Sequence, residues 1–299
     1  MTAIETALRA GSYASLVLLV GVAAFWLYIW REGRRNRVII RLCWAGWGLS
    51  LLTAVLLLAA EMARTKSGLL DVIATRAGTS LVVRLVLIAL AWSWLRELSR
   101  TREPVLPGRT ATTSEPDRKD GPSARALPGV AVLGLLPLTW ITTGRSVTGR
   151  YAVAKAVLAT LHLTAMAVWL GGLVVLVVIL LPRDNPTALH SALPRFSPLA
   201  ATAVAVLAVT GVLHALAETN GFSKLTHTGY GALVLAKLAA FAVMLLLGNE
   251  GRRYTGHRFD ALVVGERSRL QILCLAVGAE LAIGALVLAL SAALSLAPT

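Results

Sequence analysis

A histidine, a methionine and a tryptophan follow one another at helical spacing in the apolar stretch LHLTAMAVWLGGL, residues 161–173. His162, Met166 and Trp169 stand at i, i+4 and i+7, so on a helix they form one continuous stripe. Imidazole and thioether together are a ligand set suited to copper, and the soft thioether favours Cu(I). The stripe equally fits a histidine that only hydrogen-bonds a neighbouring helix and a methionine that fills a gap in packing. Spacing alone leaves both interpretations open.

Two more histidines extend the candidate metal site. His214 lies near the end of a later apolar run, and His227 lies in the connection that follows it. At a rise of ~1.5 Å per residue, we expect His162 about 10 Å and His214 about 5 Å below the outer face of a membrane. A short connection makes their helices antiparallel neighbours, so the two imidazoles should meet in an externally open pocket. His227 would then catch an ion at its mouth.

Four charged residues lie inside or at the edge of apolar runs, where charge is costly. Lys237 and Glu280 are expected at nearly equal depth on consecutive helices, which predicts a buried ion pair. Arg84 is similarly expected to pair with Glu61. We interpret these charges as structural, with proton or ion coupling as the alternative.

Small residues follow the metal-ligand candidates directly. Gly171 and Gly172 come after Trp169 and leave a bare helix surface that a second helix backbone can approach closely. We therefore expect these three residues to pack helices together.

The elements that carry these residues are transmembrane helices. The chain has 299 residues, 57% of them apolar, and a mean hydropathy of +0.72. Several apolar runs approach the ~20 residues that a helix needs to cross a bilayer. The predicted fold is an all-α polytopic bundle of eight transmembrane helices, at residues 11–30, 39–61, 79–98, 127–143, 154–181, 199–217, 230–248 and 270–296.

The net charge of +14 sets orientation and does not indicate nucleic acid as a partner. Most basic residues fall in the first, third, fifth and seventh connections between the predicted helices. The positive-inside rule then places those connections in the cytoplasm and both termini outside it. No GxSxG, GxxxxGK[ST] or HExxH motif is present, so we expect no enzymatic activity.

A polar stretch divides the predicted helices into two groups. Residues 100–126 are rich in proline, threonine and mixed charge, which is typical of a flexible linker. We expect it to separate membrane helices 1–3 (residues 1–99) from helices 4–8 (residues 127–299). Arg84-Leu85 and Lys237-Leu238 each follow a glycine by six residues, which allows a four-plus-four duplication.

Three blocks of the C-terminal half together resemble the CopD copper-resistance family. They are LHLTAMAVWLGGL, RFSPLAATAVAVLAVTGVLHAL from Arg195, and GYGALVLAKLAAFAVMLLLGNEGRR from Gly229. The resemblance covers a core at residues 154–299 and extends more loosely to the N-terminal half. It implies an eight-helix protein of the bacterial inner membrane that moves copper across it, together with a CopC-like periplasmic copper carrier, which we expect to be a separate protein.

One departure from the family pattern concerns the segment before the fifth predicted helix. A Ser-Gly-His-Ala-type element there commonly offers a periplasmic histidine, whereas this chain has SVTGRYAVAK with Arg150 at that place. A guanidinium has no lone pair for a cation. The retained histidine of the family pattern is His162.

Two alternatives remain open at this point. The first is a membrane electron-transfer protein that holds haem between His162 and His214, because histidine is a common axial ligand of haem iron. The second is an accessory subunit of a larger membrane complex, docked through the face at Gly171 and Gly172.

Overall fold

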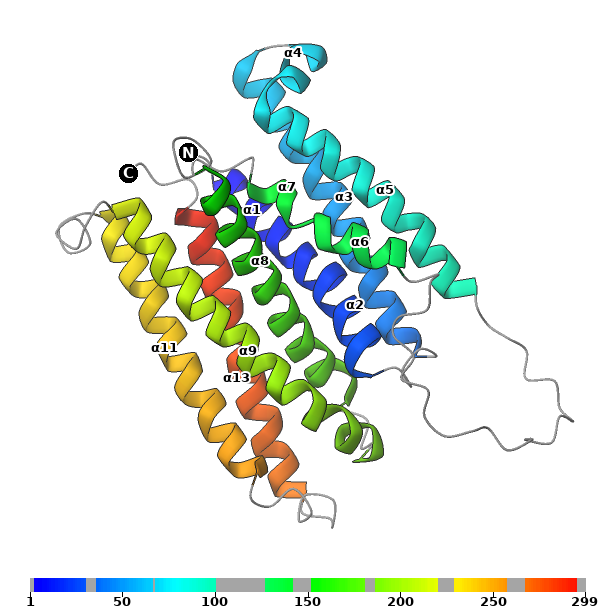
Figure 1. Ribbon diagram of the computed structural model, residues 1–299, viewed down its shortest axis with the longest axis vertical. Coiled ribbons are helices and arrows are strands. Elements are labelled where there is room, and N and C mark those ends of the chain that lie inside the picture. Colours follow the sequence, from blue (N-terminus) through cyan, green and yellow to red (C-terminus); the bar gives the residue numbers. More distant parts are fainter. Residues whose placement is uncertain are drawn as a thin grey trace, which may run out of the picture.

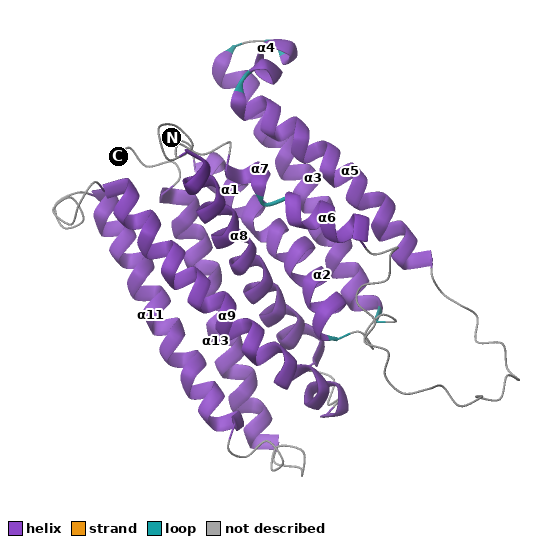
Figure 2. Cartoon of the chain, viewed as in Figure 1, coloured by secondary structure: helices purple, strands orange, loops and turns teal. Residues whose placement is uncertain are grey.

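The computed structural model of the chain shows a bundle of long helices that run side by side, without strands in the part that it describes (Figures 1 and 2). The all-helical prediction is confirmed for this part. The structure describes residues 3–30, 36–66, 68–100, 127–141, 152–180, 186–219, 229–256 and 267–294.

The chain forms long helices and several short helical segments, and three of the short segments are π-helical (η). The elements are α1 (Ala3–Leu16), η1 (Val17–Gly21), α2 (Val22–Ala24), η2 (Phe25–Ile29), α3 (Arg37–Thr65), α4 (Leu69–Ala74), α5 (Arg76–Arg100), α6 (Leu127–Leu135), α7 (Leu138–Ile141), α8 (Ala152–Val175), η4 (Leu176–Leu180), α9 (Pro186–Thr219), α11 (Gly229–Gly256) and α13 (Arg267–Leu294).

Six of the described helices are long and apolar enough to cross a membrane, which makes this a multi-pass membrane protein. Two further apolar stretches are Ala131–Trp140, which covers parts of α6 and α7, and Val234–Leu246, which lies within the 28-residue α11. They fall where the fourth and seventh of the eight membrane helices were predicted. The six spans are Ala3–Ile29, Arg37–Thr65, Arg76–Arg96, Ala152–Ile179, Ser191–His214 and Cys274–Ala292.

The prediction of one continuous fourth helix is wrong for the residues described there. The chain forms α6 and α7 instead, with a turn at Leu136 and Pro137 between them. Proline lacks an N–H, and its ring clashes with the carbonyl four residues earlier, so the helix is interrupted. Even straightened, residues 127–141 would reach only about 22 Å, less than the ~30 Å of a hydrocarbon core.

The first membrane-spanning helix (Ala3–Ile29, from α1 to η2) and α8 form the centre of the bundle. In its most apolar stretch, the first helix has 72% of its residues buried and α8 has 61%, against 28% for α3 and 22% for α13. The two central helices cross at paired glycines: a methyl group on Gly171 would lie 2.5 Å from the Cα of Gly21. A methyl group on Gly21 would overlap the carbonyl oxygen of Ala167. Only glycine permits so close a contact between two helix backbones.

The neighbouring glycine completes the packing of α8. A methyl group on Gly172 would overlap the ring of Phe196 on α9. Trp169 is also buried, with its ring 6.4 Å from that of Phe241 on α11. Because Gly171 and Gly172 lie against helices of this same chain, they do not form a free docking face, and the accessory-subunit alternative loses its structural basis.

Several helix ends gather at one end of the bundle. The start of α1, the end of α13, the start of α8, the end of α9 and the start of α11 lie there together (Figure 1). His162 is the eleventh residue of α8, Lys237 the ninth of α11, and His214 the sixth from the end of α9. All three residues therefore lie toward the same end of the molecule.

Candidate functional site

The two imidazoles predicted to meet do lie together. The ring centroids of His162 on α8 and His214 on α9 are 6.0 Å apart, and the ring planes stand at 80°. The neighbouring backbone of α9 is close as well, since a methyl group on Gly211 would lie 3.6 Å from Cε1 of His162. This close approach leaves no slot for a haem macrocycle between the two helices, so the haem alternative gains no support.

A threonine that the sequence interpretation missed holds one of these rings. The Nδ1 atom of His162 is 2.8 Å from the hydroxyl oxygen of Thr210, which is itself buried on α9. Thr210 precedes His214 by four residues and so lies on the same face of α9. That spacing was visible in the sequence, but a hydroxyl inside a span carries no charge that would single it out.

A third helix brings a cation to the site. Lys237 on α11 and His214 both interact electrostatically with His162. The candidate site is therefore built from three helices, with two imidazoles and an ammonium group near one another. The ammonium opposes the charge of any cation that the imidazoles bind.

The predicted ion pair between Lys237 and Glu280 does not form. A methyl group on Gly248 of α11 would lie 2.9 Å from Oε1 of Glu280, so the carboxylate lies beside that glycine. Gly248 is eleven residues beyond Lys237, which is about 16 Å along a helix. The predicted pairing is wrong because α11 and α13 are shifted relative to each other along their axes. Lys237 and Glu280 therefore do not lie at equal depth.

Arg84 forms a second polar cluster, in the N-terminal half. Its side chain is 2% exposed and donates to three oxygens: Nε to Thr139 Oγ1 at 3.0 Å, Nη2 to the Thr139 carbonyl at 2.8 Å and Nη1 to Ser12 Oγ at 3.3 Å. Its guanidinium carbon also lies 3.7 Å from the ring centroid of Trp140. Ser80 donates to the same Thr139 carbonyl at 2.6 Å. Neutral oxygens and an aromatic face thus surround this buried charge.

The predicted partner of Arg84 is engaged elsewhere. Glu61 accepts two hydrogen bonds from Arg64, one turn later on α3, through Nε at 3.1 Å and Nη2 at 2.5 Å. This pair lies at the exposed end of α3, whereas Arg84 is deep in the bundle. The predicted Arg84–Glu61 pair is therefore wrong, because the arginine finds its acceptors on α7 and α1.

Of the other residues considered in the metal-site prediction, the structure describes only Met166. Met166 is half-buried and packs against the hydrophobic core, one turn along α8 from His162. His227 and Arg150 fall outside the described residues. Within residues that the structure describes, no group of three or more His, Cys, Asp or Glu side chains converges as a metal site would require. Among the described residues, the two histidines therefore form a pair.

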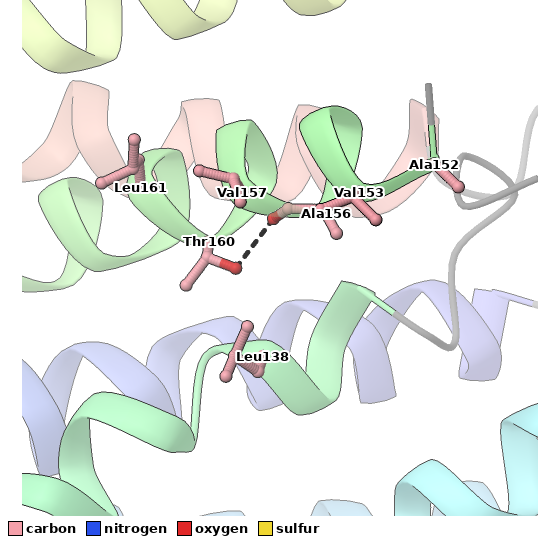
Figure 3. Close-up of a pocket in the computed structure, with 7 residues that line it drawn as sticks. All are labelled: Leu138, Ala152, Val153, Ala156, Val157, Thr160 and Leu161. Atoms are coloured by element: carbon pink, nitrogen blue, oxygen red, sulfur yellow. Dashed lines mark hydrogen bonds between the residues drawn. The ribbon is translucent and has the colours of Figure 1, made fainter. Parts of the chain in front are cut away.

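A cavity of about 440 Å³ lies between α7 and the first turns of α8, but it carries little chemistry. Leu138 of α7 faces six residues of α8 across it (Figure 3). The hydroxyl of Thr160 donates to the Ala156 carbonyl of its own helix at 2.8 Å, as the dashed line in Figure 3 shows. The other lining side chains are apolar, so this cavity is not the candidate site.

Two imidazoles at this separation can share one metal ion. With about 2.0 Å from metal to nitrogen and about 1.1 Å from nitrogen to ring centre, one ion between the rings spans centroids up to about 6.2 Å apart. The observed 6.0 Å lies just inside that limit. The arrangement suits a metal that accepts few ligands, with nitrogen donors and a nearby thioether.

Comparison with known proteins gives matches over different parts of the chain. The family model described as Copper resistance protein D (CopD) matches residues 190–294. Copper transport protein CutJ of Bacillus subtilis (strain 168) is 33% identical over 124 residues, which cover 40% of this chain but only 23% of that relative. Copper resistance protein D of Pseudomonas syringae pv. tomato is 27% identical over 274 residues, covering 87% of this chain and 84% of that relative. No solved structure matches the chain.

Proposed function

Because the chain belongs to the CopD family, we propose that it is a copper permease of the bacterial inner membrane. The observation that carries this proposal is the pair of imidazoles of His162 and His214, 6.0 Å apart at one end of the bundle. Relatives whose names refer to copper transport and copper resistance supply the identity of the metal.

The proposed capture step takes place at the histidine pair. A copper ion enters from the end of the bundle where α8 begins and binds between the nitrogens of His162 and His214. Met166, one helical turn further along α8, offers a thioether as the next ligand, which favours the Cu(I) state. His227, in the connection between α9 and α11, completes the proposed metal ligands.

Charges further along the path have a structural or coupling role in this proposal. Lys237 lies near the imidazoles and opposes the binding of a cation, so the ion is held loosely enough to move on. Glu280 is 8% exposed and lies more deeply, beside Gly248. Its carboxylate offers a negative charge to an ion that has left the histidines and moves toward the opposite end of the bundle. Arg84 and Glu61 take no part in the path.

The proposed topology has eight passes in two groups of four, with the interrupted pair α6 and α7 as the fourth pass and both termini extracytoplasmic. The start of α1 and the end of α13 lie at the same end of the bundle, as an even number of crossings requires (Figure 1). Residues 100–126 then form a cytoplasmic linker between residues 1–99 and 127–299. The capture site faces the periplasm, where a CopC-like carrier would deliver copper.

Transport into vesicles tests this proposal. The purified chain is reconstituted into liposomes that contain a copper-sensitive dye, and Cu(I) is added outside. We expect copper uptake by the wild type and loss of most uptake in the His162→Ala, His214→Ala double variant.

The matched control is His190→Ala, which removes a histidine near the start of α9, at the opposite end of that helix from His214. Its uptake should equal that of the wild type. Equal uptake by the double variant and the wild type, or no uptake by either, would overturn the proposed permease.

A further inference from the structure

The hydroxyl of Thr210 has two short contacts that need two protons. Its oxygen lies 2.6 Å from the carbonyl oxygen of Val206, one turn earlier on α9, and 2.8 Å from Nδ1 of His162. A third oxygen, the Leu207 carbonyl, is more distant at 3.4 Å. At each of the two short distances, a hydrogen atom must lie between the heavy atoms.

Only one assignment of those protons satisfies both contacts. A carbonyl oxygen has no proton to give, so the hydroxyl proton of Thr210 must point to Val206. The hydroxyl then has only lone pairs left for His162, which means that Nδ1 of the ring must carry the second proton. A neutral imidazole has one protonated nitrogen, so its Nε2 is left with a free lone pair.

We infer that Thr210 is a positioning residue, which fixes His162 in the Nδ1-protonated tautomer and thereby keeps Nε2 available as a metal ligand. This inference rests on the proposed function, because it names how one of the proposed copper ligands is prepared. Such hydrogen bonds to the far nitrogen of a ligating histidine fix the tautomer and the ring orientation. Here the acceptor is a hydroxyl whose own proton is already engaged by the helix backbone.

Nuclear magnetic resonance of the metal-free protein tests the tautomer without any copper. The full chain is labelled with ¹⁵N-histidine in detergent micelles, and the signals of His162 are identified by their absence in His162→Gln. We expect the protonated shift at Nδ1 and the unprotonated shift at Nε2. In Thr210→Val, the proton at Nδ1 loses its acceptor, and a substantial fraction of the Nε2-protonated form should appear. A wild-type ring protonated at Nε2 would overturn the inference.

Copper affinity provides the second measurement, with two matched variants. Thr210→Val should weaken Cu(I) binding by about 10- to 100-fold, the usual effect of removing such a partner. Thr210→Ser restores the hydroxyl and should remain within about threefold of the wild type. Thr202→Val removes an equivalent hydroxyl, bonded to the Pro198 carbonyl at 2.9 Å on the exposed side of α9, and should change nothing.

The outcomes separate the two hypotheses. If the wild type binds no copper, the proposed function fails, while the tautomer measurement still decides the role of Thr210. If the wild type binds copper and Thr210→Val binds it equally well, the positioning role is wrong and the permease proposal stands. If Thr210→Ser binds as weakly as Thr210→Val, packing and not the hydroxyl controls the site, and the inference is also overturned.

Discussion

The N-terminal and C-terminal halves of this protein each place a cation at the same point of a membrane helix. Arg84 is the ninth residue of α5, and Lys237 is the ninth residue of α11. Arg84 donates to Ser12, which stands nine residues before Gly21, and Lys237 interacts with His162, which stands nine residues before Gly171. These two glycines are the ones at which the central helices cross. The two polar clusters therefore occupy corresponding places relative to the crossing between η1 and α8.

The difference between the clusters lies in the lone pairs that they offer. A guanidinium is a donor only, and Arg84 directs its N–H groups at the oxygens of Ser12 and Thr139. That cluster is buried, its guanidinium has no electron pair to give to a metal, and its oxygens already accept hydrogen bonds from the arginine. The other cluster has His162 at the place that corresponds to Ser12, and a neutral imidazole has one unprotonated nitrogen. One half is therefore suited to hold helices together, and the other is suited to bind a cation.

Removing the guanidinium should have the largest effect on stability. Arg84→Met leaves two buried hydroxyl oxygens, those of Ser12 and Thr139, without their donor, at about 1–3 kcal/mol each, while the Thr139 carbonyl still accepts from Ser80. The loss is partly offset because a buried charge is removed as well. We expect a net loss of about 3 kcal/mol in the free energy of unfolding, measured by denaturation in mixed micelles. The control, Arg84→Lys, keeps the charge and should lose less. A variant as stable as the wild type would show that this cluster does not hold the N-terminal half together.

The crossing that joins the two halves should be the next most sensitive point. Gly171→Ala forces a methyl group into the backbone of Gly21, and overpacking of this kind costs about 1–3 kcal/mol. Gly278→Ala on α13 is the matched control, because a methyl group there meets nothing within 4 Å. The two variants are compared in the same denaturation experiment. Equal stability would mean that the halves are not held by this contact.

A pair of threonine variants should separate the roles of the two clusters. Thr139→Val removes the hydroxyl that accepts from Arg84 and should cost about 1–2 kcal/mol of stability. It should leave Cu(I) affinity unchanged, whereas Thr210→Val should lower the affinity. Both quantities are measured on both proteins. The comparison fails if Thr139→Val weakens copper binding as much as Thr210→Val does.

The smallest effect is expected for the exposed salt bridge near the end of α3. Glu61 and Arg64 are neighbours one turn apart on α3, with the arginine side chain 66% exposed. Exposed pairs at this spacing contribute about 0.5 kcal/mol or less. Glu61→Gln should therefore change the free energy of unfolding by no more than that. A loss above about 1 kcal/mol would indicate that Glu61 has a further role.

The sequence predicted those features that depend on one local property, such as the length of an apolar run, the length of a connection or the position of a proline. Long apolar runs predicted the six spanning helices, because the bilayer sets their length. A short connection predicted that the helices of His162 and His214 are neighbours, and the two rings do lie together. Pro137, already present in the expected fourth helix, accounts for its interruption.

The charge pairs were not predictable in the same way. Depth counted from the ends of two helices leaves their axial offset and their rotation unknown. For Lys237 and Glu280, that offset places the carboxylate beside Gly248, about three turns along α11 from the lysine. Arg84 donates to hydroxyl and carbonyl oxygens and not to a carboxylate, and the pattern of charges in the sequence did not indicate Thr139 as an acceptor. Thr210 was also not predicted, because its role depends on the three-dimensional contacts of its hydroxyl with Val206 and His162.

X-ray absorption at the copper edge tests the central claim of this account most directly. The full chain is loaded with one equivalent of Cu(I), and the ligands of the bound metal are identified from the scattering. We expect two imidazole nitrogens at about 2 Å, with this signature lost in His162→Ala and in His214→Ala and retained in Arg84→Lys. Copper bound without imidazole ligands, or bound identically after both histidines are removed, would contradict it.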